Sequence, residues 1–178
     1  MRQRFTAGTL PWDINALVIG TSRTKYVNEE SVGATVHSYR GANLADLINK
    51  VSQYPPLNIH TVTSIAGFND HRVASENFIF CYRALLDLIK YKFQPRILIA
   101  PKIIATSNNP SINQKIHSLN WALYNFFNSY IKEPLIISPF FNLNKSHFCH
   151  DGIHFSYSGN RAFSSLLNNL MNNFNAGF

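Results

Sequence analysis

The sequence is poor in cysteine and in charge, and each shortage excludes a class of protein. Two cysteines among 178 residues are too few for the disulfide framework of a small secreted domain. Charged residues make up 14% and hydrophobic residues 46%, which argues against a disordered chain and favours a packed core. The chain also lacks a signal-peptide-like leader and an apolar run of about 18 residues, the length that spans a bilayer. We therefore expect a soluble, intracellular and cytoplasmic domain, either whole or as a piece of a longer protein.

Acidic residues are scarcer than basic ones, since nine Asp and Glu stand against 16 Lys and Arg and give a formal net charge of +7. Such an excess attracts phosphates or an anionic surface. The basic residues are scattered, however, and no block of five or six like charges occurs. The charge therefore leaves two interpretations open, a solvated basic surface and weak binding of nucleic acid.

Short β-rich runs alternate with longer stretches of helical period, which is typical of a parallel sheet covered by helices on both faces. The runs predicted as strands are residues 16–20, 34–39, 61–67, 96–101 and 134–139. Neither a repeat nor a low-complexity linker interrupts the pattern. The sequence therefore predicts a single α/β domain over residues 1–178.

Apolar residues at helical spacing predict four helices with a core-facing stripe. A short helix begins near Asn43, and Ser158 is the expected N-cap of the last helix. The stripes consist of Leu44, Leu47, Ile48 and Val51; Phe78, Tyr82, Leu85, Leu86 and Ile89; Ile112, Ile116, Leu119, Leu123, Phe127 and Ile131; and Phe163, Leu166, Leu167, Leu170 and Phe174. These stripes belong to the core and not to a cofactor site.

The stretch LVIGTSRTKYV, residues 17–27, ends a buried strand at a glycine and then presents Thr21 and Ser22. In open α/β sheets the carboxyl edge of a strand is where side chains meet ligands. Ser and Thr after a strand also serve as turn formers or helix caps, which is the commoner use. This stretch alone therefore does not decide what Ser22 does.

Three later loops supply the partners that a nucleophilic serine needs. Gly41 follows the second predicted strand, Asn69 follows the third, and Asp151 and His154 lie three residues apart in DGIH. A serine attacks only when a base takes its proton, and the base needs a carboxylate to hold its tautomer. The oxyanion of the intermediate needs hydrogen-bond donors, which backbone N–H groups and the Asn69 amide can supply.

The order Ser22, Gly41, Asn69 and His154, with Asp151 before the histidine, resembles the SGNH (GDSL-type) hydrolase family. The resemblance extends from residue 16 to about residue 165 and implies a three-layer α/β/α sandwich with a five-stranded parallel, flavodoxin-like sheet. It implies a serine esterase in which Ser22 is the nucleophile, His154 the base and Asp151 its partner. Ser22, Gly41 and Asn69 then form the oxyanion hole, and no cofactor is needed. The family's first block usually reads Gly-Asp-Ser, whereas this chain has Thr21 in place of the acid.

Two other functions remain open at this stage, a catalytically lapsed binding module and, with less support, a metal-dependent hydrolase. The runs GTSRTKYV and SYRGANLADL faintly resemble esterase-like domains of retroelement proteins, a group that includes relatives converted to RNA binding. A catalytically lapsed module that binds RNA or protein through its basic surface is therefore the main alternative to an esterase. The sequence does not name the substrate, because acetylated sugars, lipids and thioesters are all hydrolysed by proteins of this kind.

Several remaining polar residues have a structural interpretation that competes with a functional one. The run HFCHDGIH suggests zinc, but its spacing matches no recurrent ligand pattern, so we predict no metal. We expect Asp70 to steady Asn69, and Arg23, His71 and Arg72 to lie at the rim of the site, where they would meet a small ester substrate. Four further residues are expected to be structural or on the surface: His37, His60, His117 and Cys81.

Overall fold

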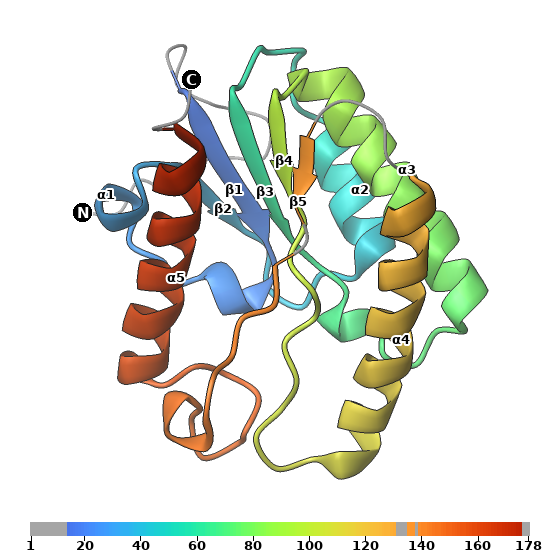
Figure 1. The fold of residues 1–178 in the computed structure, drawn as a ribbon, viewed down its shortest axis with the longest axis vertical. Helices are drawn as coiled ribbons and strands as arrows, with labels where there is room; N and C mark the ends of the chain where they lie inside the picture. Colours follow the sequence, from blue (N-terminus) through green and yellow to red (C-terminus); the bar gives the residue numbers. More distant parts are fainter. Residues whose placement is uncertain (1–13, 131–134, 138, 176–178) are drawn as a thin grey trace.

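The protein is described from a computed structural model that places residues 14–130, 135–137 and 139–175 (Figure 1). Its centre is a five-stranded sheet in which all neighbouring strands are parallel, in the order β2-β1-β3-β4-β5. The strands are β1 Ala16–Gly20, β2 Thr35–Ser38, β3 Thr61–Ile65, β4 Ile97–Ile99 and β5 Leu135–Ile137. The five predicted strands and the expected α/β sheet are confirmed, each strand lying within its predicted range.

Helices cover both faces of the sheet, as Figure 1 shows, with α1 and α5 on one side and α2, α3 and α4 on the other. The helices are α1 Glu29–Val32, α2 Leu44–Ser52, α3 Ser75–Phe93, α4 Pro110–Ser129 and α5 Tyr157–Asn175. Three short 3₁₀ turns, η1 Ser22–Thr24, η2 Phe68–Asp70 and η3 Lys145–His147, lie in the loops. The result is a three-layer α/β/α sandwich.

The two core clusters follow from the alternation of side chains along the strands. In β1, Leu17 and Ile19 join the cluster under α2, α3 and α4, whereas Ala16 and Val18 join the cluster under α1 and α5. Every residue of β1 is buried because both faces of a parallel sheet are covered. Nearly continuous apolar strands are therefore what this architecture requires.

Most predicted helix stripes are in the core, and one predicted cap is wrong. The hydroxyl of Ser156 accepts the N–H of Gly159 at 3.2 Å, so Ser156 caps α5, and Ser158 lies inside its first turn. α2 begins directly after Asn43, as predicted, and the Asn43 side chain caps it by accepting a hydrogen bond from the Asp46 N–H. The prediction for Ile131 falls outside the described residues, as does that for the Phe174 side chain.

The carboxyl ends of the parallel strands lie at one edge of the sheet. The loops that carry η1, η2 and the segment before α5 leave from this edge (Figure 1). Such an edge is where open α/β sheets bind ligands. None of the helices in the described ranges is both long and apolar enough to cross a membrane.

Candidate active site

Ser22 is the first residue of η1, directly after β1, and is half-buried. The turn is held through the carbonyl of Thr21, which accepts hydrogen bonds from the Thr24 N–H at 3.0 Å and from the hydroxyls of Thr24 and Ser38, each at 2.8 Å. Thr21 is the N-cap of this turn and makes no side-chain cap bond. Ser22 is thus not the cap, and its hydroxyl makes no hydrogen bond among the described residues.

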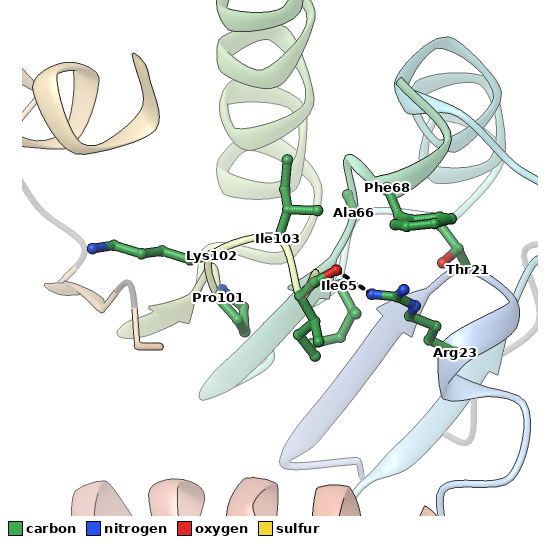
Figure 2. A pocket seen from close by; sticks show the side chains of 9 residues that line it. Thr21, Arg23, Ile65, Ala66, Phe68, Pro101, Lys102 and Ile103 are labelled. Carbon is green, nitrogen blue, oxygen red and sulfur yellow. Dashed lines mark hydrogen bonds between the residues drawn. The ribbon is translucent and has the colours of Figure 1, made fainter. Parts of the chain in front are cut away.

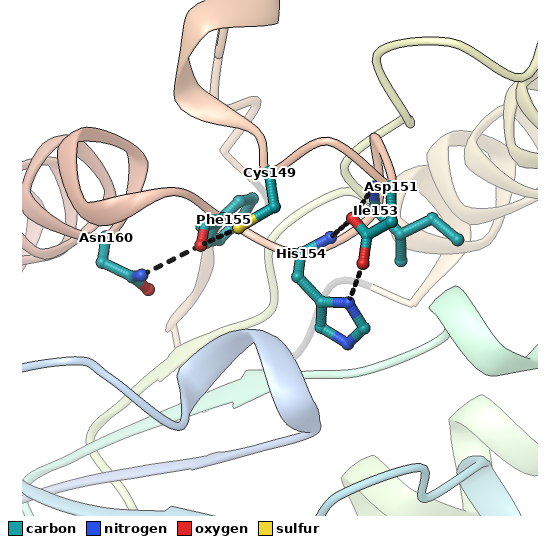
Figure 3. A network of polar contacts seen from close by, with 6 residues as sticks. All are labelled: Cys149, Asp151, Ile153, His154, Phe155 and Asn160. Carbon is teal, nitrogen blue, oxygen red and sulfur yellow. Dashed lines mark hydrogen bonds and ion pairs between the residues drawn. The ribbon is translucent and has the colours of Figure 1, made fainter.

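Asp151 and His154 form a hydrogen-bonded pair before α5 (Figure 3). His154 Nδ1 lies 2.6 Å from Asp151 Oδ2, and Asp151 Oδ1 accepts the backbone N–H groups of Ile153 at 2.9 Å and His154 at 3.0 Å. These bonds, the one from the His154 side chain above all, lower the pKa of the Asp151 carboxyl to about 2. A carboxylate only accepts, so Nδ1 carries the proton and Nε2, which points away from Asp151, is left as an acceptor.

The segment that carries this pair packs against the loop after β4. Gly152 has a positive φ of 67°, and a Cβ there would lie 2.0 Å from Oδ1 of Asn108. Ser107 donates its N–H to the Gly152 carbonyl at 2.9 Å, and Cys149 donates its N–H to the His154 carbonyl at 2.7 Å. The backbone around the pair is therefore held on both sides, although the side chains of His154 and Asp151 are 54% and 47% exposed.

The residues expected to form an oxyanion hole have unused donors. Neither Ser22 nor Gly41 donates its backbone N–H in the part of the chain that the structure describes. Asn69 uses one amide N–H on the Ala42 carbonyl at 2.7 Å, which leaves its second N–H available. Gly41 has a φ of 70°, and no atom lies within 4 Å of where its Cβ would be. The space beside the Gly41 backbone is thus open to a ligand.

Asp70 connects the Asn69 turn to α2. Both of its carboxylate oxygens accept the Leu44 N–H, at 3.1 and 3.2 Å, at the first residue of that helix. Burial raises the pKa of the Asp70 carboxyl, and the bond from Leu44 opposes that rise. Because Asn69 binds the neighbouring Ala42 carbonyl, this turn holds the Gly41 loop at two points. The expectation that Asp70 steadies Asn69 thus has a structural basis.

Arg23 does not lie at the rim, contrary to the sequence prediction, because it is only 4% exposed. Its Nη1 donates to the Ile104 carbonyl, its guanidinium lies 4.0 Å from the centre of the Phe68 ring, and the Phe155 ring is 5.5 Å away. Burial lowers the pKa of Arg23 to about 9, an effect that the charge of Asp151 partly offsets. Arginine is mostly found on protein surfaces, whereas this one is buried against Phe68, Phe155 and the Ile104 carbonyl.

The other two rim candidates differ in exposure. His71 is half-buried, and its Nδ1 lies 2.9 Å from the Phe68 carbonyl. Arg72 is exposed, as predicted for a residue at the rim. Arg23 contacts Phe68 of the Asn69 turn and also Phe155, which follows His154. It therefore brings together the turn of Ser22, the turn of Asn69 and the segment of His154.

The remaining histidines and cysteines have other partners or lie on the surface. Nδ1 of His147 accepts the Asn144 N–H at 3.2 Å, and the Cys149 thiol lies 3.2 Å from the Phe155 carbonyl. No group of three or more His, Cys, Asp or Glu in the described ranges is placed to hold a metal. The other predicted structural residues are a buried His37 beside the Tyr54 hydroxyl, half-buried His60 and Cys81, and exposed His117.

Solved structures with the same architecture include proteins that are named as an esterase and a lipase. A structure titled a putative platelet activating factor from Streptococcus pneumonia matches with a TM-score of 0.74 and 17% identity, over 89% of this chain and 84% of that one. A carbohydrate esterase family 3 protein from Talaromyces cellulolyticus matches with a TM-score of 0.71 and 14% identity, over 91% and 98%. A GDSL-like lipase from Bacteroides thetaiotaomicron gives 0.70 and 16%, over 92% of each chain.

The chain has the SGNH hydrolase fold. No protein-family model and no curated protein matches the sequence of this chain. At 17% identity or less to these three structures, the likeness shows the fold alone. Within that fold, no hydrogen bond among the described residues joins the Ser22 hydroxyl to His154. Catalytic hydrogen bonds are often long without a substrate and shorten when one binds.

Proposed function

We propose that this SGNH-fold chain is a serine esterase that hydrolyses a carboxylic ester, with an acetyl or longer acyl group, through an acyl-enzyme. The observation that carries the proposal is the 2.6 Å hydrogen bond between His154 Nδ1 and Asp151, in the segment that Arg23 links to the turn of Ser22. A carboxylate that fixes the tautomer of a histidine and leaves Nε2 as an acceptor is the arrangement that a general base needs.

The first half of the reaction forms the acyl-enzyme. His154 Nε2 takes the proton of the Ser22 hydroxyl as Oγ bonds to the carbonyl carbon, and the carbonyl oxygen becomes an oxyanion. The unused N–H groups of Ser22 and Gly41 and the second amide N–H of Asn69 are the donors for that oxyanion. The intermediate then expels the alcohol, which receives the proton from His154.

The second half releases the acid. Water attacks the acyl carbon as His154 takes one of its protons. The second intermediate then breaks its bond to Ser22 Oγ, which receives that proton from His154, and the carboxylic acid leaves. Asp151 stays ionised throughout, because its pKa of about 2 is far below neutral pH, and it stabilises the imidazolium that forms in each half. No step needs a cofactor.

The neighbours support an esterase but leave the acyl group and the alcohol unnamed. One neighbour is an acetylxylan esterase from Geobacillus stearothermophilus, and a catalytic mutant of that protein replaces a serine with alanine. The main alternative, a lapsed module that binds RNA or protein through its basic surface, has one basic residue fewer on that surface because Arg23 is buried. We therefore favour a small ester over nucleic acid as the ligand of this protein.

The experiment that tests the function is labelling with a fluorophosphonate probe together with hydrolysis of p-nitrophenyl acetate. The probe needs an activated serine and no knowledge of the substrate. We expect Ser22→Ala to abolish labelling and to lower turnover by about 1000-fold or more. Ser165→Ala, an exposed serine of α5, is the matched control and keeps both signals. Unchanged labelling of Ser22→Ala would refute the proposal.

A further inference from the structure

Arg23 is a buried cation that forms no ion pair among the described residues, although the charge of Asp151 acts on it from a distance. Its guanidinium donates one hydrogen bond, to a neutral carbonyl, while Nε and Nη2 have no partner among the described residues. No described carboxylate forms an ion pair with it either. Burying a charge is costly unless it is paired and hydrogen-bonded, so the resting protein leaves this group incompletely satisfied.

The aromatic rings beside Arg23 do not supply acceptors for its unpaired N–H groups. Phe68 lies against the guanidinium at 4.0 Å from its ring centre, which is a cation–π contact. The N–H groups of Nε and Nη2 lie in the guanidinium plane and remain unpaired among the described residues. Nε and Nη2 form one edge of the fork, and both N–H groups of such an edge can donate to the same carboxylate oxygen.

A small pocket lies at this group, lined by residues that follow β1, β3 and β4 (Figure 2). It has a volume of about 10 Å³, which is room for about one water molecule and hence for one carboxylate oxygen. Two lining residues are cations, Arg23 and Lys102, most of the others are apolar, and none is acidic. Figure 2 shows the Lys102 side chain extending away from Arg23, so Arg23 supplies the charge inside.

The pocket is lined by sequence neighbours of two proposed catalytic groups. Its lining includes Thr21 and Arg23, which flank Ser22, and Phe68, which precedes Asn69. A ligand in this pocket therefore contacts the same two turns, η1 and η2, that carry the proposed nucleophile and a proposed donor of the oxyanion hole.

We propose that this pocket is an anion subsite, in which the Nε and Nη2 edge of Arg23 binds a carboxylate carried by the ester substrate. The inference rests on the proposed esterase function and narrows its substrate class to esters with an anionic group. That carboxylate belongs either to the acyl group or to the alcohol of the ester. In both cases the group that contacts Arg23 is a carboxylate.

The test compares charged and neutral esters in wild type and three variants. Mono-p-nitrophenyl succinate carries the carboxylate on the acyl side and is compared with p-nitrophenyl acetate; 4-acetoxybenzoate carries it on the alcohol side and is compared with phenyl acetate. Arg23→Met removes the charge and both donors, and Arg23→Lys keeps the charge but loses the planar edge. Arg96→Met removes an exposed arginine next to the first residue of β4, at the opposite edge of the sheet, and is the control.

We expect Arg23→Met to lower kcat/KM for one of the two charged esters by about 10- to 100-fold more than for its neutral counterpart. Arg23→Lys loses less than Arg23→Met, and Arg96→Met changes charged and neutral esters alike. The ester that responds identifies which side of the substrate carries the carboxylate. An equal loss on all four esters would show that Arg23 only holds the loops together and would overturn the subsite.

Thermal unfolding with succinate gives a second readout that does not need catalysis. Succinate raises the melting temperature of wild type and of Arg96→Met, but not of Arg23→Met, because a ligand stabilises only the fold that binds it. If no fluorophosphonate labels Ser22 while this shift still depends on Arg23, the esterase proposal fails and the anion subsite stands. If the probe labels Ser22 and succinate shifts no variant, the subsite fails and the esterase stands.

Discussion

Gly159 gives the sharpest test of how the His154 segment is held, because a substitution that normally stabilises a helix should here destabilise it. Gly159 is the third residue of α5, where alanine is favoured over glycine by up to about 1 kcal/mol. An alanine Cβ at this position would lie 1.8 Å from the backbone oxygen of His147 and 3.1 Å from its Cα. A normal carbon–oxygen contact is about 3.3 Å, so α5 and the His147 backbone have to separate by about 1.5 Å.

The separation strains the segment between these two points, which contains Asp151 and His154. The His147 carbonyl also accepts the Ser156 N–H at 3.0 Å, so it cannot turn away without losing a hydrogen bond. Overpacking of this kind costs about 1–3 kcal/mol, which exceeds the helix-propensity gain. The net expectation for Gly159→Ala is a free energy of unfolding lowered by about 1–2 kcal/mol, a fall in melting temperature of roughly 2–8 °C.

The assay is urea unfolding followed by intrinsic fluorescence, together with p-nitrophenyl acetate hydrolysis on the folded protein. A shift of about 1 Å in a catalytic group costs on the order of 100-fold in rate, so we expect kcat to fall more than stability predicts. Ser165→Ala tests helix propensity alone, on an exposed turn of the same helix. A Gly159→Ala protein that is as stable and as active as wild type would refute the close approach of α5 to His147.

Four further predictions concern the pH dependence of turnover, the pH dependence of stability, metals and nucleic acid. Turnover should fall at acidic pH, because only a neutral imidazole accepts the serine proton; a flat profile from pH 5 to 8 would argue against a histidine base. The pKa of Asp151 is lower in the folded state, so its stabilising effect is present above about pH 4 and is lost as pH falls toward 2; acid titrations of wild type and Asp151→Asn should therefore converge there. EDTA should leave turnover intact, and loss of activity that zinc restores would reassign the HFCH run to a metal site. RNA affinity should be weak, fall with salt, and weaken further in a variant with exposed Arg40 and Arg72 changed to Ala; tight binding without fluorophosphonate labelling would favour the lapsed module.

The sequence by itself determined the positions of the strands and of the main helices, and it indicated which residues follow which strand. Helix and strand periods are local properties, so the strand of residues 16–20 and the stripe from Phe78 to Ile89 could be read from a few neighbouring residues. The pairing of Asp151 with His154 was also local, because three residues within one turn bring their side chains into contact. The parallel sheet then follows, since alternating strands and helices place successive strand ends at one edge.

Only the tertiary structure decided what depends on contacts between distant segments. Arg23 was expected at the rim, yet Phe68, Phe155 and the Ile104 carbonyl bury it, and none of these is near it in sequence. The cap of α5 is Ser156 and not Ser158 because the helix starts two residues earlier than predicted, where the chain returns toward η3. Local propensity fixes which residues can form an element, but the burial of a charge and the exact start of a helix depend on which other segments pack against them.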